Sequence, residues 1–258
     1  MKAALVKGIL PACLLAVAAF AADSWGAAPA AERYGDTLVR EVQEANRSVL
    51  GVTLTATAKD GQPINIARGM GAATEASTAA LFNSMGERIG SISISFRSGR
   101  GDPQPIAAWI SRRIYVSDNL VEADPFVAGA KRSARGQALV YRMIDRHPDL
   151  VTLAMHVTAP GGPNTIIASN FGRIGKLGDK DDNRVIETKA VLKEVTNGGK
   201  RLAVELPQLD RSGKVIGALS TSFVIAAGET PDDVYRKALA VRDELARATP
   251  SVSWLYAR

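Results

Sequence analysis

The sequence has little of several residue types that carry chemistry. Its 258 residues contain one cysteine, Cys13, and two histidines, His147 and His156. A single cysteine excludes an internal disulfide and a cysteine-based zinc site. Aromatic residues make up 5% of the chain, and its lysines and arginines are scattered rather than clustered. Because a nucleic-acid surface needs clustered basic residues, we expect no nucleic-acid partner.

Long apolar runs are also lacking outside the first residues. "GILPACLLAVAAFAA" (8–22) follows Lys2 and Lys7 and contains an A-x-A cleavage pattern, which is typical of a signal peptide. The run is shorter than the roughly 20 residues of a membrane anchor. Cys13 lies inside it rather than at its end, which argues against a lipoprotein. We expect a signal peptide over 1–22, a linker over 23–32, no membrane span in the mature chain, and a periplasmic or secreted location.

Two stretches of the remaining chain resemble each other. "GERIGSISISF" (86–96) and "GKVIGALSTSF" (213–223) share six of their eleven residues at a shift of 127. "VTLTATAKDGQ" (52–62) falls on "LAMHVTAPGGP" (153–163) at a shift of 101. One insertion of about 26 residues explains the change of shift. The sequence therefore predicts an internal duplication, with modules over 33–128 and 133–258.

Each module contains a similar series of predicted elements. A helix precedes two strands that alternate apolar and polar residues, and a glycine-containing turn joins the strands. The first module continues with "GAATEASTAALFNSM", which we interpret as an alanine-rich helix. The second has two extra strands, "AVLKEVT" and "KRLAVELPQL", around Asn197-Gly198, a strong hairpin signal.

Both modules end in a helix, with predicted N-caps at Asp102 and Thr230 before Pro103 and Pro231. The fold class expected is α+β, with an antiparallel sheet flanked by helices in each module.

The strand over 213–223 has one bulky and one small face. Leu219, Thr221 and Phe223 lie on the bulky face, and Ser220 and Ser222 on the small one. The small face is either exposed or close-packed, or it forms the floor of a shallow ligand pocket. The sequence leaves both interpretations open.

The second module resembles the Cache family of extracellular sensor domains, which have a PAS-like fold. The resemblance is carried by "TIIASNFGRIGKLGDKDD" (165–182), by "KRLAVELPQLDRSGKVIGALSTSF" (200–223) and by the helix after Thr230. The first module is a degenerate match, so the whole chain resembles a tandem PAS-like arrangement. The resemblance implies a five-stranded antiparallel sheet with helices on one face, a ligand pocket on the other, and a small metabolite as ligand. We expect no output domain after the second module.

We therefore expect a non-catalytic sensory protein that binds a small molecule, or a periplasmic or membrane partner protein. The alternative is an adaptor that acts through protein contacts without a ligand. Candidate pocket residues are Asn170, Arg173, Arg184, Ser220 and Ser222, and either arginine is suited to a carboxylate or is simply a surface charge.

We predict no cofactor and no metal site. Both histidines are interpreted as structural because no acidic residues stand at ligand spacing from them. "GDKDDN" (178–183) is interpreted as a solvated helix start, and no motif of a hydrolase or nucleotide-binding site is found.

Overall fold

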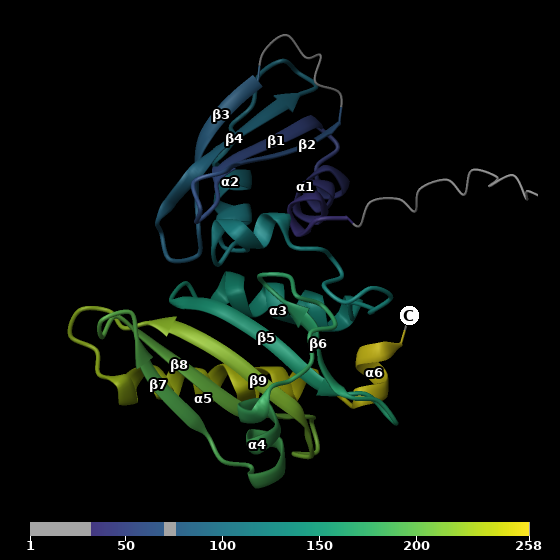
Figure 1. Cartoon of the computed structure of the whole chain (residues 1–258), viewed down its shortest axis with the longest axis vertical. Coiled ribbons are helices and arrows are strands. Elements are labelled where there is room, and N and C mark those ends of the chain that lie inside the picture. The colour runs from purple at the N-terminus through teal and green to yellow at the C-terminus, as the bar shows by residue number, and fades with distance from the viewer. Residues whose placement is uncertain (1–31, 70–75, 258) are drawn as a thin grey trace, which may run out of the picture. The chain divides into compact units, whose positions relative to one another are not determined.

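The described residues form two antiparallel sheets, each with helices packed against it (Figure 1). A computed structural model describes residues 32–69 and 76–257, which belong to one compact unit. The strand order is β2-β1-β4-β3 in the first sheet and β6-β5-β9-β8-β7 in the second. The predicted class, α+β with antiparallel sheets flanked by helices, is confirmed. The predicted signal peptide lies outside the described residues.

The elements fall into two series along the chain. The first half (33–128) contains α1 (Tyr34–Ala45), β1 (Val49–Thr57), β2 (Pro63–Gly69), β3 (Ala76–Phe82), β4 (Arg88–Phe96), α2 (Gln104–Ser111) and the 3-10 helix η1 (Ser117–Val121). The second half (133–258) contains α3 (Ala134–Arg146), β5 (Leu150–Thr158), β6 (Asn164–Ser169), α4 (Lys180–Thr188), β7 (Leu192–Thr196), β8 (Arg201–Leu209), β9 (Val215–Val224), α5 (Pro231–Ala248) and α6 (Val252–Tyr256). None of these described helices combines the length and the apolar character needed to cross a bilayer.

The two sheets have the same pairing register at the spacings of the sequence repeat. Leu54 pairs with Ile92 in the first sheet, and Met155 pairs with Leu219 in the second. The β1 and β5 members differ by 101 positions (155 minus 54), and the β4 and β9 members by 127 (219 minus 92). A register irregularity near the start of β1 recurs at the matching place in β5. The repeat therefore describes the hydrogen-bonded frame of both sheets.

The alanine-rich segment of the first half contains a strand and not the predicted helix. Residues 76–82 form β3 and pair with β4 along their whole length. Ala79 and Leu81 are buried while their neighbours are more exposed, which is the period-two pattern of a half-buried strand. The helix prediction relied on the helix propensity of alanine, which pairing with a neighbouring strand outweighs here.

This correction changes which elements distinguish the two halves. Ala79 of β3 pairs with Ile92, and Leu206 of β8 pairs with Leu219. Both differences are 127 positions, so β3 occupies the place of β8. Among its described residues, the first half therefore lacks counterparts of one strand, β7, and of α4, rather than of the two strands that the sequence suggested.

The backbone tests the two predicted helix caps and the predicted hairpin. Thr230 caps α5 by accepting a hydrogen bond from the amide of Asp233, and Pro231 is the first helical residue, as predicted. At α2 the cap residue is Pro103, and Asp102 instead accepts from the amide of Gln104 at 2.9 Å. The hairpin prediction at Asn197-Gly198 is confirmed, because φ is +52° and +60° there.

Each sheet buries its bulky face under helices. In the first half, α1 and α2 cover residues such as Leu54, Ile92 and Ile94, which are fully buried. In the second half, α3 and α5 cover the corresponding face, with Leu219 and Phe223 at its centre. Burial of these apolar side chains is the main stabilising term for each half. These helices do not cover the opposite face of either sheet.

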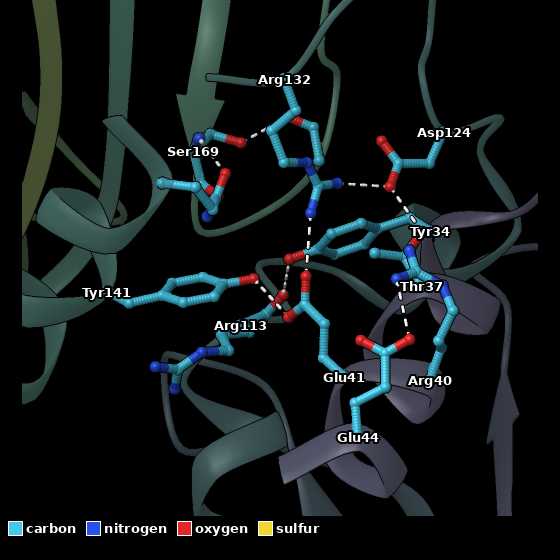
Figure 2. A network of polar contacts seen from close by, with 12 residues as sticks. Tyr34, Thr37, Arg40, Glu41, Glu44, Arg113, Asp124, Arg132, Tyr141 and Ser169 are labelled. Atoms are coloured by element: carbon cyan, nitrogen blue, oxygen red, sulfur yellow. Dashed lines mark hydrogen bonds and ion pairs between the residues drawn. The ribbon is translucent and has the colours of Figure 1, made fainter. Parts of the chain in front are cut away.

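A buried polar network joins α1 to the segment that leads into α3 (Figure 2). Arg132 donates to Glu41 at 3.0 Å and is paired with Asp124. Tyr141 donates to Glu41 at 2.9 Å, and Thr37 donates to Asp124 at 2.7 Å. Burial raises the pKa of Glu41 even though Arg132 and Tyr141 oppose the shift. The network links helices of the two halves by hydrogen bonds and ion pairs, although Oδ1 of Asp124 is buried without a hydrogen-bond partner.

Arg113 strengthens the same connection by a different contact. Its side chain is 1% exposed, and its guanidinium lies 3.9 Å from the ring centre of Trp109 and 4.2 Å from that of Tyr141. Its backbone carbonyl accepts a hydrogen bond from Tyr34 at 3.0 Å. A guanidinium between two aromatic rings is attracted to both, so Arg113 packs α2, which carries Trp109, against α3, which carries Tyr141.

Candidate functional site

A pocket of about 290 Å³ opens on the small face of the second sheet. Its floor includes alternate residues of β8 (Arg201, Ala203 and Glu205) and of β9 (Ser220 and Ser222), whose side chains point the same way. In particular, Glu205 lies opposite Ser220 and Ala203 lies opposite Ser222. The small side chains of this row leave the space that the pocket occupies. The lining residues are Tyr115, Thr152, Phe171, Arg173, Thr196, Arg201, Ala203, Glu205, Ser220, Thr221 and Ser222.

Arg201 provides positive charge at this pocket. Its Nη1 donates to the hydroxyl of Tyr115 at 2.9 Å and lies 3.1 Å from the sulfur of Met85. Its Nε is buried and has no hydrogen-bond partner. Leaving a buried donor unpaired costs about 1–3 kcal/mol. The pocket therefore presents an arginine with unused donor capacity.

Glu205 provides a carboxyl group on the same strand. Its Oε2 is buried and has no hydrogen-bond partner. Burial, and then the negative charges of Asp182, Asp179 and Asp181, raise the pKa of Glu205 to about 7. Near neutral pH this group is present both as a hydrogen-bond donor and as an anion.

The structure brings together three of the five residues predicted for the pocket. Ser220, Ser222 and Arg173 all line it. The guanidinium of Arg173 is already engaged, because its Nε and Nη2 lie 3.0 and 2.8 Å from the carboxylate oxygens of Glu122. A ligand carboxylate would therefore meet Arg201 more readily than Arg173.

The other two predicted residues lie elsewhere. Asn170 is fully buried, where its side chain donates to the carbonyls of Val151 and Arg112, each at 2.9 Å, and accepts from Leu153 at 2.8 Å. It fixes the end of β6 rather than facing the pocket. Arg184 is exposed on α4 and lines a neighbouring pocket of about 260 Å³.

Sequence reasoning missed Arg201, Glu205 and Tyr115. The alternation of "KRLAVELPQL" puts Arg201, Ala203 and Glu205 on one face, and that signal was sufficient to find the first and third. Tyr115 follows α2, outside the second half altogether. Its place in the pocket depends on tertiary packing, for which no local pattern exists.

His156 and Asp182 meet beside the pocket, although the sequence indicated no acidic partner for either histidine. Nδ1 of His156 lies 3.2 Å from Oδ2 of Asp182, and Ser220 donates to the other oxygen of Asp182 at 3.3 Å. Burial lowers the pKa of His156, and the nearby carboxylate of Asp182 opposes the shift. The "GDKDDN" segment does begin a helix, as predicted, but Asp182 is 2% exposed and so is not solvated.

An acidic cluster is formed by the carboxylate oxygens of Asp179, Asp182 and Glu205. One ligand atom from each lies within 4.8 Å of the others. His147 is 3.3 Å from Glu244 and so lies in a different environment. His156 borders this cluster at Asp182.

Comparison of the chain with protein-family models, curated proteins and solved structures finds no match. The site is therefore interpreted from its own geometry.

Proposed function

We propose that this chain is an exported protein that binds a small polar metabolite in the pocket on the second sheet and does not catalyse a reaction. The observation that carries this function is the pair of unsatisfied groups, Nε of Arg201 and Oε2 of Glu205, along one strand of the pocket. A ligand that accepts from Arg201 and donates to Glu205 would satisfy both groups. Recovering two buried, unpaired polar groups favours binding.

The ligand class follows from size and charge. About 290 Å³ is at the lower end of the range for ligand sites, which suits a small metabolite. Hydroxyls of Thr152, Ser220 and Ser222 give a polar floor. We expect a compact molecule with a carboxylate or similar anionic group at one end and an amine or hydroxyl at the other.

The resemblance to Cache domains agrees with this function. The second half has five antiparallel strands, with α3 and α5 on one face and the pocket on the other. We propose that the two halves are tandem PAS-like modules, over 33–128 and 133–258, behind a cleaved signal peptide, and that the protein is periplasmic or secreted. The matched registers of the two sheets support a duplication.

An adaptor without a ligand is the alternative. It is favoured by exposed apolar side chains, because Val127, Leu177 and Tyr256 are 44, 59 and 38% exposed and line one pocket. Such surfaces commonly contact other proteins. In this case the pocket on the second sheet would stay empty of metabolites.

A thermal-shift screen of the mature protein against carboxylates, amines, amino acids and purines tests the function. We expect a compound that raises Tm, and we expect Arg201→Gln and Glu205→Gln each to reduce its affinity at least about tenfold. Arg184→Ala is the matched control, because it removes an arginine next to the pocket and should leave the affinity unchanged. The screen is run with EDTA so that metal ions do not contribute.

Two outcomes would overturn the function. One is that no compound raises Tm. The other is a compound whose affinity survives both Arg201→Gln and Glu205→Gln. Since Arg201 also contacts Tyr115, the more conservative change at Glu205 keeps the test valid if Arg201→Gln unfolds the protein.

A further inference from the structure

Each sheet has two edge strands, whose unpaired backbone groups can pair with a strand of another chain. The edges are β2 and β3 in the first sheet and β6 and β7 in the second (Figure 1). Proteins usually protect such edges by proline, by charged side chains, by short length or by a segment that covers them. Three of these four edges have such protection.

The edges β2 and β6 are protected by proline, by a side chain and by backbone. β2 begins with Pro63, which cannot donate a ladder hydrogen bond. The side chain of Arg33 donates to the carbonyl of Asn65 in the same strand at 3.4 Å. β6 is covered by the segment that follows it, because the amide of Ile166 donates to the carbonyl of Lys176 at 2.9 Å.

The edges β7 and β3 differ from each other in charge and length. β7 is five residues long and presents Lys193 and Glu194 to solvent. β3 is seven residues long, and its sequence "ASTAALF" contains neither a charged residue nor proline. Among the described residues, β4 is the strand that pairs with β3. The end of β3 is marked by Phe82, whose amide donates to the hydroxyl of Ser111 at 3.2 Å.

The second half shows what the equivalent edge accepts. β8, which occupies the place of β3, pairs with β9 on one side and antiparallel with β7 on the other. Leu192 of β7 lies opposite Glu205 of β8, and Thr78 of β3 lies 127 positions before Glu205. The described part of the first half has no strand in that place. A fifth, antiparallel strand therefore fits beside β3.

The strand β3 is complementary to a second copy of itself. Its odd-numbered residues face the core and its even-numbered residues are more exposed. Antiparallel pairing of two copies about Ala79 keeps core-facing residues on the same side in both. It places Thr78 opposite Ala80 of the second copy, and Phe82, which is 39% exposed, opposite Ala76. Large side chains thus meet small ones, and no like charges are opposed within the strand pair.

We propose that β3 pairs antiparallel with β3 of a second copy of this chain, which joins two four-stranded sheets into one eight-stranded sheet across a two-fold axis. Both copies use the same patch, as a closed dimer requires. Seven paired residues span about 24 Å and form a small interface, so we expect a weak dimer with a Kd of roughly 10–100 µM. This dimer does not depend on the metabolite, because the pocket lies on the other sheet.

The dimer is measured by sedimentation equilibrium of the mature protein at concentrations from about 1 to 500 µM. The weight-average mass is expected to rise from that of one chain towards that of two and to fit a single Kd. No ligand is added, so the outcome of the metabolite screen does not affect this measurement.

Lysines introduced on the exposed side of β3 test its role. The double variant Thr78→Lys, Ala80→Lys places lysine opposite lysine in the dimer, and like charges opposite each other oppose strand pairing. We expect it to raise the Kd at least about tenfold with unchanged far-ultraviolet circular dichroism. If it unfolds, the single variant Thr78→Lys replaces it, because that side chain is exposed.

The matched control adds the same two charges away from β3. Leu177→Lys with Val195→Lys changes side chains that are 59 and 49% exposed, and it should leave the Kd unchanged.

Cross-linking tests the register. Cys13 precedes residue 23, so the expected mature protein contains no other cysteine to interfere. Thr78→Cys would lie diagonally opposite its own copy, with roughly 7–8 Å between the two residues. A short bismaleimide is expected to join this variant into a dimer. The control Val195→Cys, also at an exposed strand position, should remain a single chain.

Three results would contradict the dimer. The first is a protein that stays monomeric throughout the concentration range, which would also be the outcome if β3 instead pairs with a strand of a different protein. The second is a Kd that the lysines on β3 leave unchanged. The third is equal cross-linking of Thr78→Cys and Val195→Cys.

Discussion

The same strand face is open in the first half of the molecule and covered in the second. Thr53 and Thr55 of β1 are exposed, whereas Ala154 and His156, 101 positions later, are buried. In the second half the segment between β6 and β7 covers this face, because Ala154 packs with Ile174 and His156 meets Asp182 of α4, while α4 packs on β8 and β9. The described residues of the first half contain no counterpart of α4. One added segment therefore turns an exposed face into an enclosed site.

The residues at matching positions differ accordingly. Glu205 lies 127 positions after Thr78, and Ser220 lies 127 positions after Ser93. Thr78 and Ser93 are hydrogen-bonded to each other at 3.1 Å, whereas Oε2 of Glu205 has no hydrogen-bond partner. The frame is repeated, but the unsatisfied groups that suit a ligand are found in the half that has the insertion.

The largest expected effect tests the shared frame through two equivalent glycines. A Cβ atom at Gly90 would lie 1.9 Å from the carbonyl oxygen of Thr55, and one at Gly217 would lie 1.8 Å from that of His156. The obstacle is backbone, which cannot rotate away. We expect Gly90→Ala and Gly217→Ala each to lower the free energy of unfolding by about 3 kcal/mol, measured by urea denaturation.

Gly162→Ala is the control, since its Cβ would make only an ordinary 3.4 Å contact. A small effect at one of the paired glycines and a large effect at the other would mean that the halves do not share this close approach.

A smaller effect is expected where the halves differ inside their cores. Gln208 is 1% exposed and neither atom of its amide has a hydrogen-bond partner, while Leu81, 127 positions earlier, is a fully buried leucine. We expect Gln208→Leu to raise the free energy of unfolding by about 1–2 kcal/mol, because it removes two unpaired polar atoms. Thermal denaturation measures the change. A loss of stability would show that the amide has a partner, such as buried water.

The smallest effect concerns the turns that precede β4 and β9. Asn83 accepts from the amides of Met85 and Glu87, and Asp210, 127 positions later, accepts from those of Ser212 and Lys214. Hydrogen bonds, chiefly from the Ser212 side chain, lower the pKa of Asp210. The stability that the ionised side chain of Asp210 contributes is therefore present above the unfolded pKa of about 3.9. This stability is lost as the pH falls through the lower pKa of the folded state.

We expect Asp210→Asn to lower the free energy of unfolding by less than about 1 kcal/mol at pH 7. The difference in free energy of unfolding between the variant and the unchanged protein should become smaller below about pH 4. Urea denaturation between pH 3 and 7 measures this difference in free energy of unfolding. A difference that stays constant across this range would contradict the assignment.

Much of the frame was predictable from sequence because it depends on local patterns. Alternation predicted the bulky and small faces of the strand expected over 213–223, and Asn197-Gly198 predicted the hairpin of β7 and β8. The two shifts of the repeat, 101 and 127 residues, relate residues that occupy the same pairing positions in the two sheets. The prediction failed over 76–82, where small residues are compatible with either helix or strand and β4 decides the outcome.

The site was less predictable because its charged members meet only in the folded chain. Ser220 and Ser222 were identified by alternation, and Arg201 and Glu205 carry the same signal. Asp182 reaches His156 because α4 folds back over the sheet, and no spacing in the sequence indicates that contact. Long-range approach of this kind depends on packing rather than on local pattern.

The most direct test of the difference between the two halves is amide chemical-shift mapping by nuclear magnetic resonance. The mature protein is titrated with the compound that gives the largest increase in Tm in the metabolite screen. We predict that the amides of Glu205, Ser220 and Ser222 shift, while those of Thr78 and Ser93 at the matching positions do not. Shifts confined to the first half, or the absence of any binding compound, would contradict the claim that the covered face of the second half is the binding site.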